Sequence, residues 1–500
     1  MEFYGFLLLP LLIICIHALM KTAKKLFKNK NLPPGPIGLP IIGNLLTIGD
    51  RPHESLANLA KIYGPLMTVK LGSVNVVVAS STEMAKEILQ KHDQNFLGRP
   101  IPDAVTAEKG YELSMAWLSG GLQWKKLRKI CQSQIFTMQR LDSLQDLRHQ
   151  MMKNMVARVD EARETQEAIH VGRLVFGTTL NLLSNTMFSV DMLDPKSDAL
   201  KELKVLIAKI MELAGKPNIS DYFPFLKSFD FQGIRGEIKV SYDRLHDLLD
   251  KIIDQRLKRR ASGSCWTGDF LDVLLDHTEE RGPDKLDHLD VNLLLMDLFI
   301  GGTDTTTTTM EWAMAELLHN PAILAKVKQE LSVEIGSEKD VQEQDLSRLP
   351  YLEAIIKETM RLHTTAPLLL PHRAEADVQI CGYTIPKHTQ ILVNAWSISR
   401  DTNYWDEPTK FKPERFLNSE IDFRGKNFSF IPFSAGRRIC PGLNLGVRMV
   451  SLILANLVHK FEWKLPNAVE PKEMDMKDKF GITLQKAEPL VAFPVTRASC

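Results

Sequence analysis

The feature that most constrains this chain is a single cysteine, Cys440, inside a glycine-rich segment near the end of the sequence. From Phe433 to Gly442 the segment reads Phe-x-x-Gly-x-Arg-x-Cys-x-Gly, five fixed positions ahead of a helical pattern over 444–458. Such a match arises by chance in a chain of this length on the order of one time in ten thousand. Glycines let a backbone approach a flat ligand closely, and amide donors in a tight turn stabilise a negative sulfur. The segment predicts a loop that presents a thiolate to a planar group; the alternative is an inert buried cysteine before a helix.

Composition narrows the class of protein further. Hydrophobic residues make up 44% and charged residues 25% of the 500 residues, which are averages for a globular protein. Lys and Arg number 62 against 61 for Asp and Glu, so the formal net charge of +1 argues against a nucleic acid partner. The other cysteines stand singly, without a C-x-x-C pair, which argues against a zinc knuckle or a disulfide framework. We expect a reducing compartment.

Residues 1–30 have the pattern of a membrane anchor. The run 3–20 is almost wholly apolar and just long enough to cross a bilayer, and lysines follow it over 21–30. A cleaved signal peptide would carry its positive charge before the apolar run. The positive-inside rule therefore predicts a single-pass transmembrane signal anchor with the rest of the chain cytosolic. A soluble protein that begins with an apolar core helix is the alternative.

Beyond a stiff proline-rich hinge over 33–36, which sets a domain boundary near residue 31, helical patterns dominate. Helices are expected over 82–92, 200–213, 240–260, 291–319 and 351–363. Strand-like runs lie at 66–70, 74–79 and 378–393, the first two joined as a hairpin. No composition shift divides residues 31–500. We expect a mainly α protein with minor β, a single large domain over 31–500 preceded by the anchor helix.

Together with two further motifs, the Cys440 segment resembles the haem-thiolate monooxygenases, the cytochromes P-450, over essentially all of residues 31–500. Glu358 and Arg361 form the family's E-x-x-R pair, and Arg415 lies in the later P-E-R-F segment. Alone an E-x-x-R pair is uninformative, because such pairs are common on solvated helix faces. The resemblance implies that the Cys440 thiolate ligates the iron of haem b, and that Glu358, Arg361 and Arg415 form a buried structural ion network beneath it.

The resemblance also implies how the haem is held. Arg438, two residues before the cysteine, can neutralise a haem propionate. Trp124 and Arg128, one helical turn apart, match the family's W-x-x-x-R pair at the propionates. Arg99 and His372 match further propionate-side positions, with the arginine after His372 as an alternative to it. The loop residues expected against the haem are Phe433, Gly436 and Gly442.

Two adjacent glycines, Gly301 and Gly302, lie inside the longest helical pattern, where each costs about 1 kcal/mol relative to alanine. Room for dioxygen against the haem would compensate for that cost. In the family an acid-alcohol pair, here Asp304 and Thr305, widens the helix locally and relays protons to oxygen. A bond to its own backbone is the alternative for Thr305. Asp297 shares the helix stripe of Gly301 and Thr305, and it either anchors a substrate hydroxyl or is paired with a loop arginine or a backbone amide.

Partners follow from the resemblance and from what the chain lacks. The resemblance implies use of O2 with electrons from NADPH, and the sequence has no flavin or nicotinamide fingerprint. A separate NADPH-cytochrome reductase on the endoplasmic reticulum membrane is therefore expected. A basic helix could form its docking face, and the alternative for the lysines is a solvated helix face; the residues are Trp124, Lys125, Lys126, Arg128 and Lys129. The segments expected to line the substrate pocket are apolar, which predicts a small lipophilic substrate. The expected pocket residues are Leu298, Gly301, Ala366, Leu368, Phe480 and Ile482.

The amino-acid sequences of several motifs are most similar to those of plant microsomal enzymes of the geraniol hydroxylase group. Segments 221–224, 297–306, 311–314 and 479–486 carry this likeness. The resemblance implies a terpenoid hydroxylase, with a monoterpene alcohol such as geraniol as substrate; an abietane-type diterpenoid or a phenolic or alkaloid precursor is the alternative. The chain departs from the group at 363–367, where two threonines replace the usual two prolines. An oxygen-independent haem-thiolate isomerase or dehydratase and a non-catalytic haem sensor are remoter alternatives.

Overall fold

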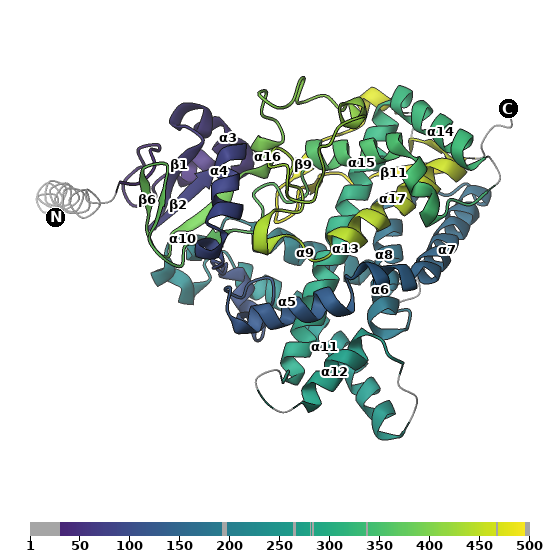
Figure 1. Ribbon diagram of the computed structural model, residues 1–500, viewed down its shortest axis with the longest axis horizontal. Helices are drawn as coiled ribbons and strands as arrows, with labels where there is room; N and C mark the ends of the chain where they lie inside the picture. Colours follow the sequence, from purple (N-terminus) through teal and green to yellow (C-terminus); the bar gives the residue numbers. More distant parts are fainter. Residues whose placement is uncertain are drawn as a thin grey trace, which may run out of the picture.

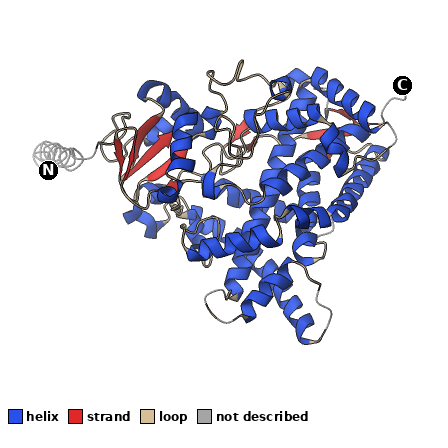
Figure 2. Cartoon of the chain, in the orientation of Figure 1, coloured by secondary structure: helices blue, strands red, loops and turns tan. Residues whose placement is uncertain are grey.

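The computed structural model describes residues 31–192, 198–263, 267–280, 282, 285–336, 339–466 and 469–495. Helices make up most of these residues, and the largest sheet lies at one end of the molecule (Figures 1 and 2). The expected mainly α class with minor β is confirmed. The anchor expected over 1–30 lies outside the described residues. Within them, no helix combines the length and the apolar character needed to cross a bilayer.

The central element is α13, His288–His319, which crosses the middle of the helical part (Figure 1). It begins three residues before the expected start, because Asp287 and Asp290 form a reciprocal capping box at its N-terminus. The helices that pack against it most extensively are α8 (Val171–Phe188), α17 (Leu443–Lys460) and α11 (Ile234–Ala261). Because helices surround α13, most of its residues are buried although it carries a run of polar threonines.

The other helices vary from one turn to five turns. Those in the first half are α2 Leu45–Ile48, α3 Pro52–Tyr63, α4 Thr82–Lys86, α5 Leu122–Gln134, α6 Met138–Ser143, α7 Gln145–Glu164, α9 Asp198–Gly215 and α10 Ile219–Tyr222. Those in the second half are α12 Phe270–Glu279, α14 Pro321–Ile335, α15 Pro350–Leu362 and α16 Ala395–Ile398. Each expected helix is present, and the helix expected over 82–92 continues from α4 into a π-helical turn, Glu87–Lys91.

The largest sheet has the strand order β1-β2-β7-β4. Its strands are β1 Leu66–Leu71, β2 Val74–Ala79, β7 Gln390–Val393 and β4 His372–Arg373. The expected hairpin is confirmed, since β1 and β2 pair antiparallel, and β7 then joins β2 in parallel. Alternate residues of β2 enter different apolar clusters: Val77 packs with α4, while Val76 and Val78 pack with α3. Burial on both faces explains why the strand is continuously apolar from Val76 to Ala79.

Short strand pairs complete the fold. Their bounds are β3 Ile169–His170, β5 Val378–Ile380, β6 Tyr383–Ile385, β8 Glu462–Lys464, β9 Asp478–Lys479, β10 Gln485–Lys486 and β11 Val491–Val495. The region 378–393, expected as strand-like, resolves into β5, β6 and β7, with β5 and β6 reversing at Gly382, whose φ is +80°. The β9–β10 hairpin is positioned against α13, which brings the end of the chain to the central helix.

Candidate active site

The loop of Cys440 is built by short-range hydrogen bonds. A tight turn at Gly436–Arg438 precedes it, and the Cys440 N–H donates to the Phe433 carbonyl over 3.0 Å. Gly436 has φ +68°, and a Cβ there would lie 1.8 Å from the Leu89 carbonyl oxygen, so only glycine fits. Burial raises the pKa of the Cys440 thiol, while the N–H groups at the start of α17 and the nearby Arg128 charge act in the opposite direction. The loop therefore aims amide donors at the sulfur.

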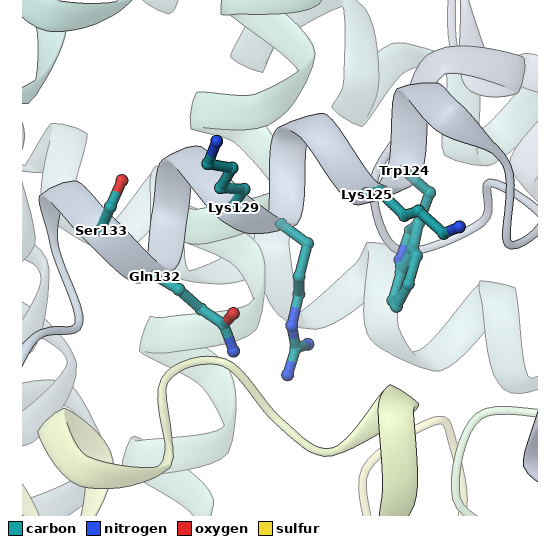
Figure 3. A pocket seen from close by; sticks show the side chains of 6 residues that line it. Trp124, Lys125, Lys129, Gln132 and Ser133 are labelled. Atoms are coloured by element: carbon teal, nitrogen blue, oxygen red, sulfur yellow. The ribbon is translucent and has the colours of Figure 1, made fainter.

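Helix α5 supplies two groups beside this loop. Arg128 donates to the Ile439 carbonyl, next to Cys440. Trp124 is buried, and the Arg438 guanidinium lies 4.4 Å from the centre of its ring. A cavity of about 370 Å³ runs along this helix, and Trp124 and Gln132 point from α5 toward the yellow-green segment (Figure 3). Its lining residues are Trp124, Lys125, Arg128, Lys129, Gln132 and Ser133.

Two further basic residues reach the same place from distant segments. Arg99 is buried and donates to the carbonyls of Leu370 and Pro371 over 2.6 and 2.7 Å. His372 is buried and its Nδ1 donates to the Phe96 carbonyl over 2.7 Å. Arg373, the alternative to His372, instead lies 3.2 Å from the Glu375 carboxylate. The ion pair occupies Arg373, which leaves His372 as the residue that faces the buried arginines.

The basic side chains gathered here lack compensating anions. Within the described chain, Arg99, Arg128 and Arg438 form no ion pair with a carboxylate, and the Nε atoms of Arg99 and Arg438 are buried without a hydrogen-bond acceptor. Burial first, and repulsion between like charges second, lower the pKa of Arg438 to about 10 and that of Arg99 well below its usual value. Buried, unpaired guanidinium groups are costly. The donor set therefore fits a ligand that brings two carboxylates, as the propionates of a haem would.

The two glycines of α13 have different surroundings. A Cβ at Gly301 would meet nothing within 4 Å, so this residue faces open space. A Cβ at Gly302 would lie 2.7 Å from the Leu183 side chain of α8. The expectation that room for a ligand explains both glycines is corrected: Gly302 serves the packing of α13 on α8, and Gly301 alone provides the opening.

The expected acid-alcohol pair diverges around the helix. The Thr305 hydroxyl donates to the Gly301 carbonyl over 2.6 Å, which is the backbone alternative. Asp304 is buried on another side of α13, where its carboxylate accepts from Thr483 over 2.7 Å and from Gln485 over 2.8 Å. Burial raises the pKa of Asp304 to about 6, against these hydrogen bonds. The expected local widening is not observed, because α13 is an uninterrupted α-helix between its described ends.

The Glu358 carboxylate gathers the two expected arginines. Arg361 donates to it twice, over 2.7 and 2.9 Å, and Arg415 donates over 3.0 Å. The backbone N–H of Lys412 adds a fourth bond over 2.8 Å. The Glu358 and Arg361 side chains have no exposed surface. The network ties α15 to the chain before the Cys440 loop.

Comparison with known proteins now decides the family. A family model described as cytochrome P-450 matches residues 33–493. The chain belongs to the cytochrome P-450 family. Members are monooxygenases whose haem is held by a cysteine thiolate, so this P-450 is an oxidoreductase with that cofactor.

Relatives of this P-450 cover almost the whole chain. A geraniol 8-hydroxylase of Swertia mussotii is 50% identical over 465 residues, 93% of this chain and 94% of the relative. A geraniol 8-hydroxylase of Catharanthus roseus is 47% identical, covering 94% and 95%. A drimenol monooxygenase of Persicaria hydropiper is 44% identical, covering 97% of each chain.

In this P-450 Asp297 pairs with a loop. Its carboxylate accepts from the Ser114 hydroxyl over 2.8 Å and from the Ala116 N–H over 3.4 Å. Burial raises the pKa of Asp297 to about 6. The structure therefore contains the pairing with a backbone amide, to which the Ser114 hydroxyl adds a second donor, and the acid positions the segment before α5.

The expected pocket residues lie in three surroundings. Leu298 and Gly301 are on α13. Ala366 and Leu368 follow α15, and Leu368 packs toward the cluster beneath β1 and α3. Ile482 donates its N–H to the Met211 carbonyl of α9 over 3.0 Å. The ring of Phe480 stacks on His53 of α3, with centroids 5.4 Å apart, so it faces the sheet end of the molecule.

Sequence reasoning missed the partners of Asp304. Thr483 and Gln485 are 179 and 181 residues away from it along the chain. In the sequence, Thr483 stands out only as part of segment 479–486. The one available signal was that both polar residues alternate with apolar Leu484, which is typical of a strand with one polar face.

Proposed function

We propose that this chain hydroxylates a terpenoid, first of all a monoterpene alcohol such as geraniol, with O2 and with electrons that a separate NADPH-cytochrome reductase delivers. One observation carries the proposal: unpaired buried arginines meet beside the loop of a single cysteine. Within one catalytic domain over 31–500, Cys440 would ligate the haem iron. Arg99, Arg128 and Arg438 would bind its propionates, with Trp124 and His372 beside them.

The chain's own groups support this chemistry. When bound, a thiolate-ligated haem supplies the reductive activation of O2. The amides after Cys440 favour the anionic form of the sulfur, against the effect of burial. Thr305 lies on the stripe of Gly301, and its hydroxyl can donate a proton once it leaves the Gly301 carbonyl. Asp304, with a pKa near 6, can take up and release protons near neutral pH once it leaves Thr483.

Two lines support the substrate class. The relatives in Swertia mussotii and Catharanthus roseus carry the name geraniol 8-hydroxylase, and another carries the name drimenol monooxygenase. The side chains beside Gly301, namely Leu298 and Ile300, are apolar and favour a lipophilic molecule. The test is turnover of the full chain with a reductase on a panel of monoterpene alcohols, sesquiterpene alcohols, abietanes and phenolic amines, with product identification. Hydroxylated terpenoid is the expected product; exclusive oxidation of a phenolic amine would contradict the proposal.

An exposed apolar patch on the described domain supports its association with a membrane, in addition to the proposed anchor. Segments 37–46 and 219–231 both flank the β1–β2 turn: Gly72 N–H donates to the Ile42 carbonyl over 3.0 Å, and Ser73 N–H to the Tyr222 carbonyl over 2.9 Å. Both segments expose large apolar side chains, which is typical of a lipid-contacting face. They are Ile37, Leu39, Ile41, Leu46, Ile219, Phe225, Phe229 and Phe231.

We infer that this apolar patch lies on the endoplasmic reticulum membrane, that residues 1–30 cross it once, and that the catalytic domain is cytosolic. Carbonate extraction of microsomes should leave the full chain in the membrane, and protease added to sealed microsomes should degrade the catalytic domain. Release by carbonate, or protection from protease, would contradict this topology.

The reductase is proposed to dock beside α5. Lys125 and Lys129 are exposed there, and their charges suit an acidic partner. Lys126 is less available, because its Nζ donates to the Lys285 carbonyl over 2.6 Å. Among the lysines of this basic helix, the docking face is therefore assigned to Lys125 and Lys129.

A further inference from the structure

The loop after α15 contacts α13 at the point where the chain departs from the geraniol hydroxylase pattern. Thr365, one of the two unusual threonines, has its hydroxyl oxygen 3.0 Å from that of Thr309 on α13. A proline at this position would have no hydroxyl and could not make the contact. The other unusual threonine, Thr364, donates to the Arg361 carbonyl in the last turn of the preceding helix α15 over 3.0 Å.

The direction of this hydrogen bond follows from counting protons. A hydroxyl has one proton to donate. Thr309 donates its proton to the Thr305 carbonyl over 2.9 Å, so Thr365 must be the donor to Thr309. The result is a series of hydrogen bonds that runs from Thr365 through Thr309 to the backbone carbonyl of Thr305. The hydroxyl of Thr305 in turn donates to the Gly301 carbonyl. Threonine side chains that hydrogen-bond to the preceding turn bend helices slightly, so this series of hydrogen bonds affects the local shape of α13.

The same residue also holds the C-terminal hairpin. The Thr365 carbonyl accepts from the Leu484 N–H over 2.8 Å, and the Leu484 carbonyl accepts from the Trp312 indole over 2.9 Å. Ala366 directly follows Thr365, and Ile482 lies two residues before Leu484. Thr365 thus joins two expected pocket edges to each other and to α13.

We propose that Thr365 is a positioning residue, which through Thr309 holds the main chain of Thr305 and sets the distance between α13 and the two pocket edges. The inference rests on the proposed function, in which Thr305 serves the reaction. Loss of the Thr365 hydroxyl would let the α13 segment move independently of the substrate-facing loop. Reducing equivalents would then be spent without hydroxylated product.

The test compares Thr365→Val, which keeps the shape and removes the hydroxyl, with Thr365→Ser, which keeps the hydroxyl. Two readouts apply to the full-length haem-loaded enzyme: product formed per NADPH consumed, and hydrogen exchange of the α13 amides over 303–310. Loss of one neutral hydrogen bond corresponds to about a twofold to tenfold change in an equilibrium. Thr365→Val should lower product per NADPH and accelerate exchange by factors in that range. Thr365→Ser should restore both.

Thr364→Val is the matched control, because it removes a neighbouring hydroxyl that does not reach α13. It should match wild type in both readouts. Thr309→Val offers a second route to the same break, and the double variant with Thr365→Val should be no worse than either single variant. Equal coupling and equal exchange in Thr365→Val and Thr364→Val would overturn the inference. If wild type forms no oxygen-dependent product, the proposed function fails, and the exchange data still decide whether Thr365 holds α13.

Discussion

Replacement of Glu358 by glutamine should destabilise the fold strongly. Its carboxylate accepts four hydrogen bonds, three from arginine side chains and one from a backbone N–H, and it has no exposed surface. Glutamine keeps one oxygen and points an NH2 group at the guanidinium of Arg361 or Arg415. Removing one partner of a buried ion network costs about 3 to 5 kcal/mol, because the remaining charges stay buried. That is a large part of the roughly 5 to 15 kcal/mol by which domains are stable.

The assay is urea unfolding of the full chain followed by far-ultraviolet circular dichroism. Glu353→Gln is the matched control on the same helix, since Glu353 pairs with Lys357 over 2.9 Å but its side chain is 57% exposed. The control should cost under about 1 kcal/mol. Equal unfolding midpoints for the two variants would refute the reasoning that Glu358 neutralises buried charge.

Three further outcomes follow from the site. Because burial raises the pKa of Asp304 from 3.8 to about 6, the folded state holds its proton longer than the unfolded state, and stability falls as pH rises through that range. Wild type should lose about 2 kcal/mol more than Asp304→Asn between about pH 4 and pH 7, measured by urea unfolding; parallel profiles would contradict this. Gly301→Ala should raise stability by about 1 kcal/mol, since its Cβ meets nothing, and should still lower turnover, whereas Gly302→Ala should gain less stability; equal gains would contradict the packing assignment. Charge reversal at Lys125 and Lys129 should raise the reductase KM and weaken its salt dependence, and an unchanged KM would remove α5 from the docking face.

Elements with strong local patterns could be predicted from the sequence. The β1–β2 hairpin, the long α13 and the helix after Cys440 each have periodicity, caps or turn residues that act within a few positions. The spacing of Glu358 and Arg361 on one helix puts the two groups in contact, but only the resemblance to a family implied that they form a buried network with Arg415. Resemblance to a family added Arg99 and His372, which no local pattern indicates.

Contacts between distant segments could not be predicted in this way. Helical spacing gives the faces of α13, but it does not say that α8 meets Gly302 or that the C-terminal hairpin meets Asp304. Likewise the charge pattern of α5 suggested Lys126 as a docking residue, whereas its ammonium group donates a hydrogen bond to the Lys285 carbonyl of another loop. These are tertiary packing events, and a single sequence carries no signal for which surfaces meet.

The most direct test is the carbon monoxide difference spectrum of the reduced protein in microsomes, compared between wild type and Cys440→His. Wild type should show the long-wavelength band of a thiolate-ligated haem, and the variant should lose both the band and hydroxylation. A wild-type protein without the band, or a Cys440→His variant that keeps the same band and turnover, would contradict the assignment of Cys440 as the haem ligand.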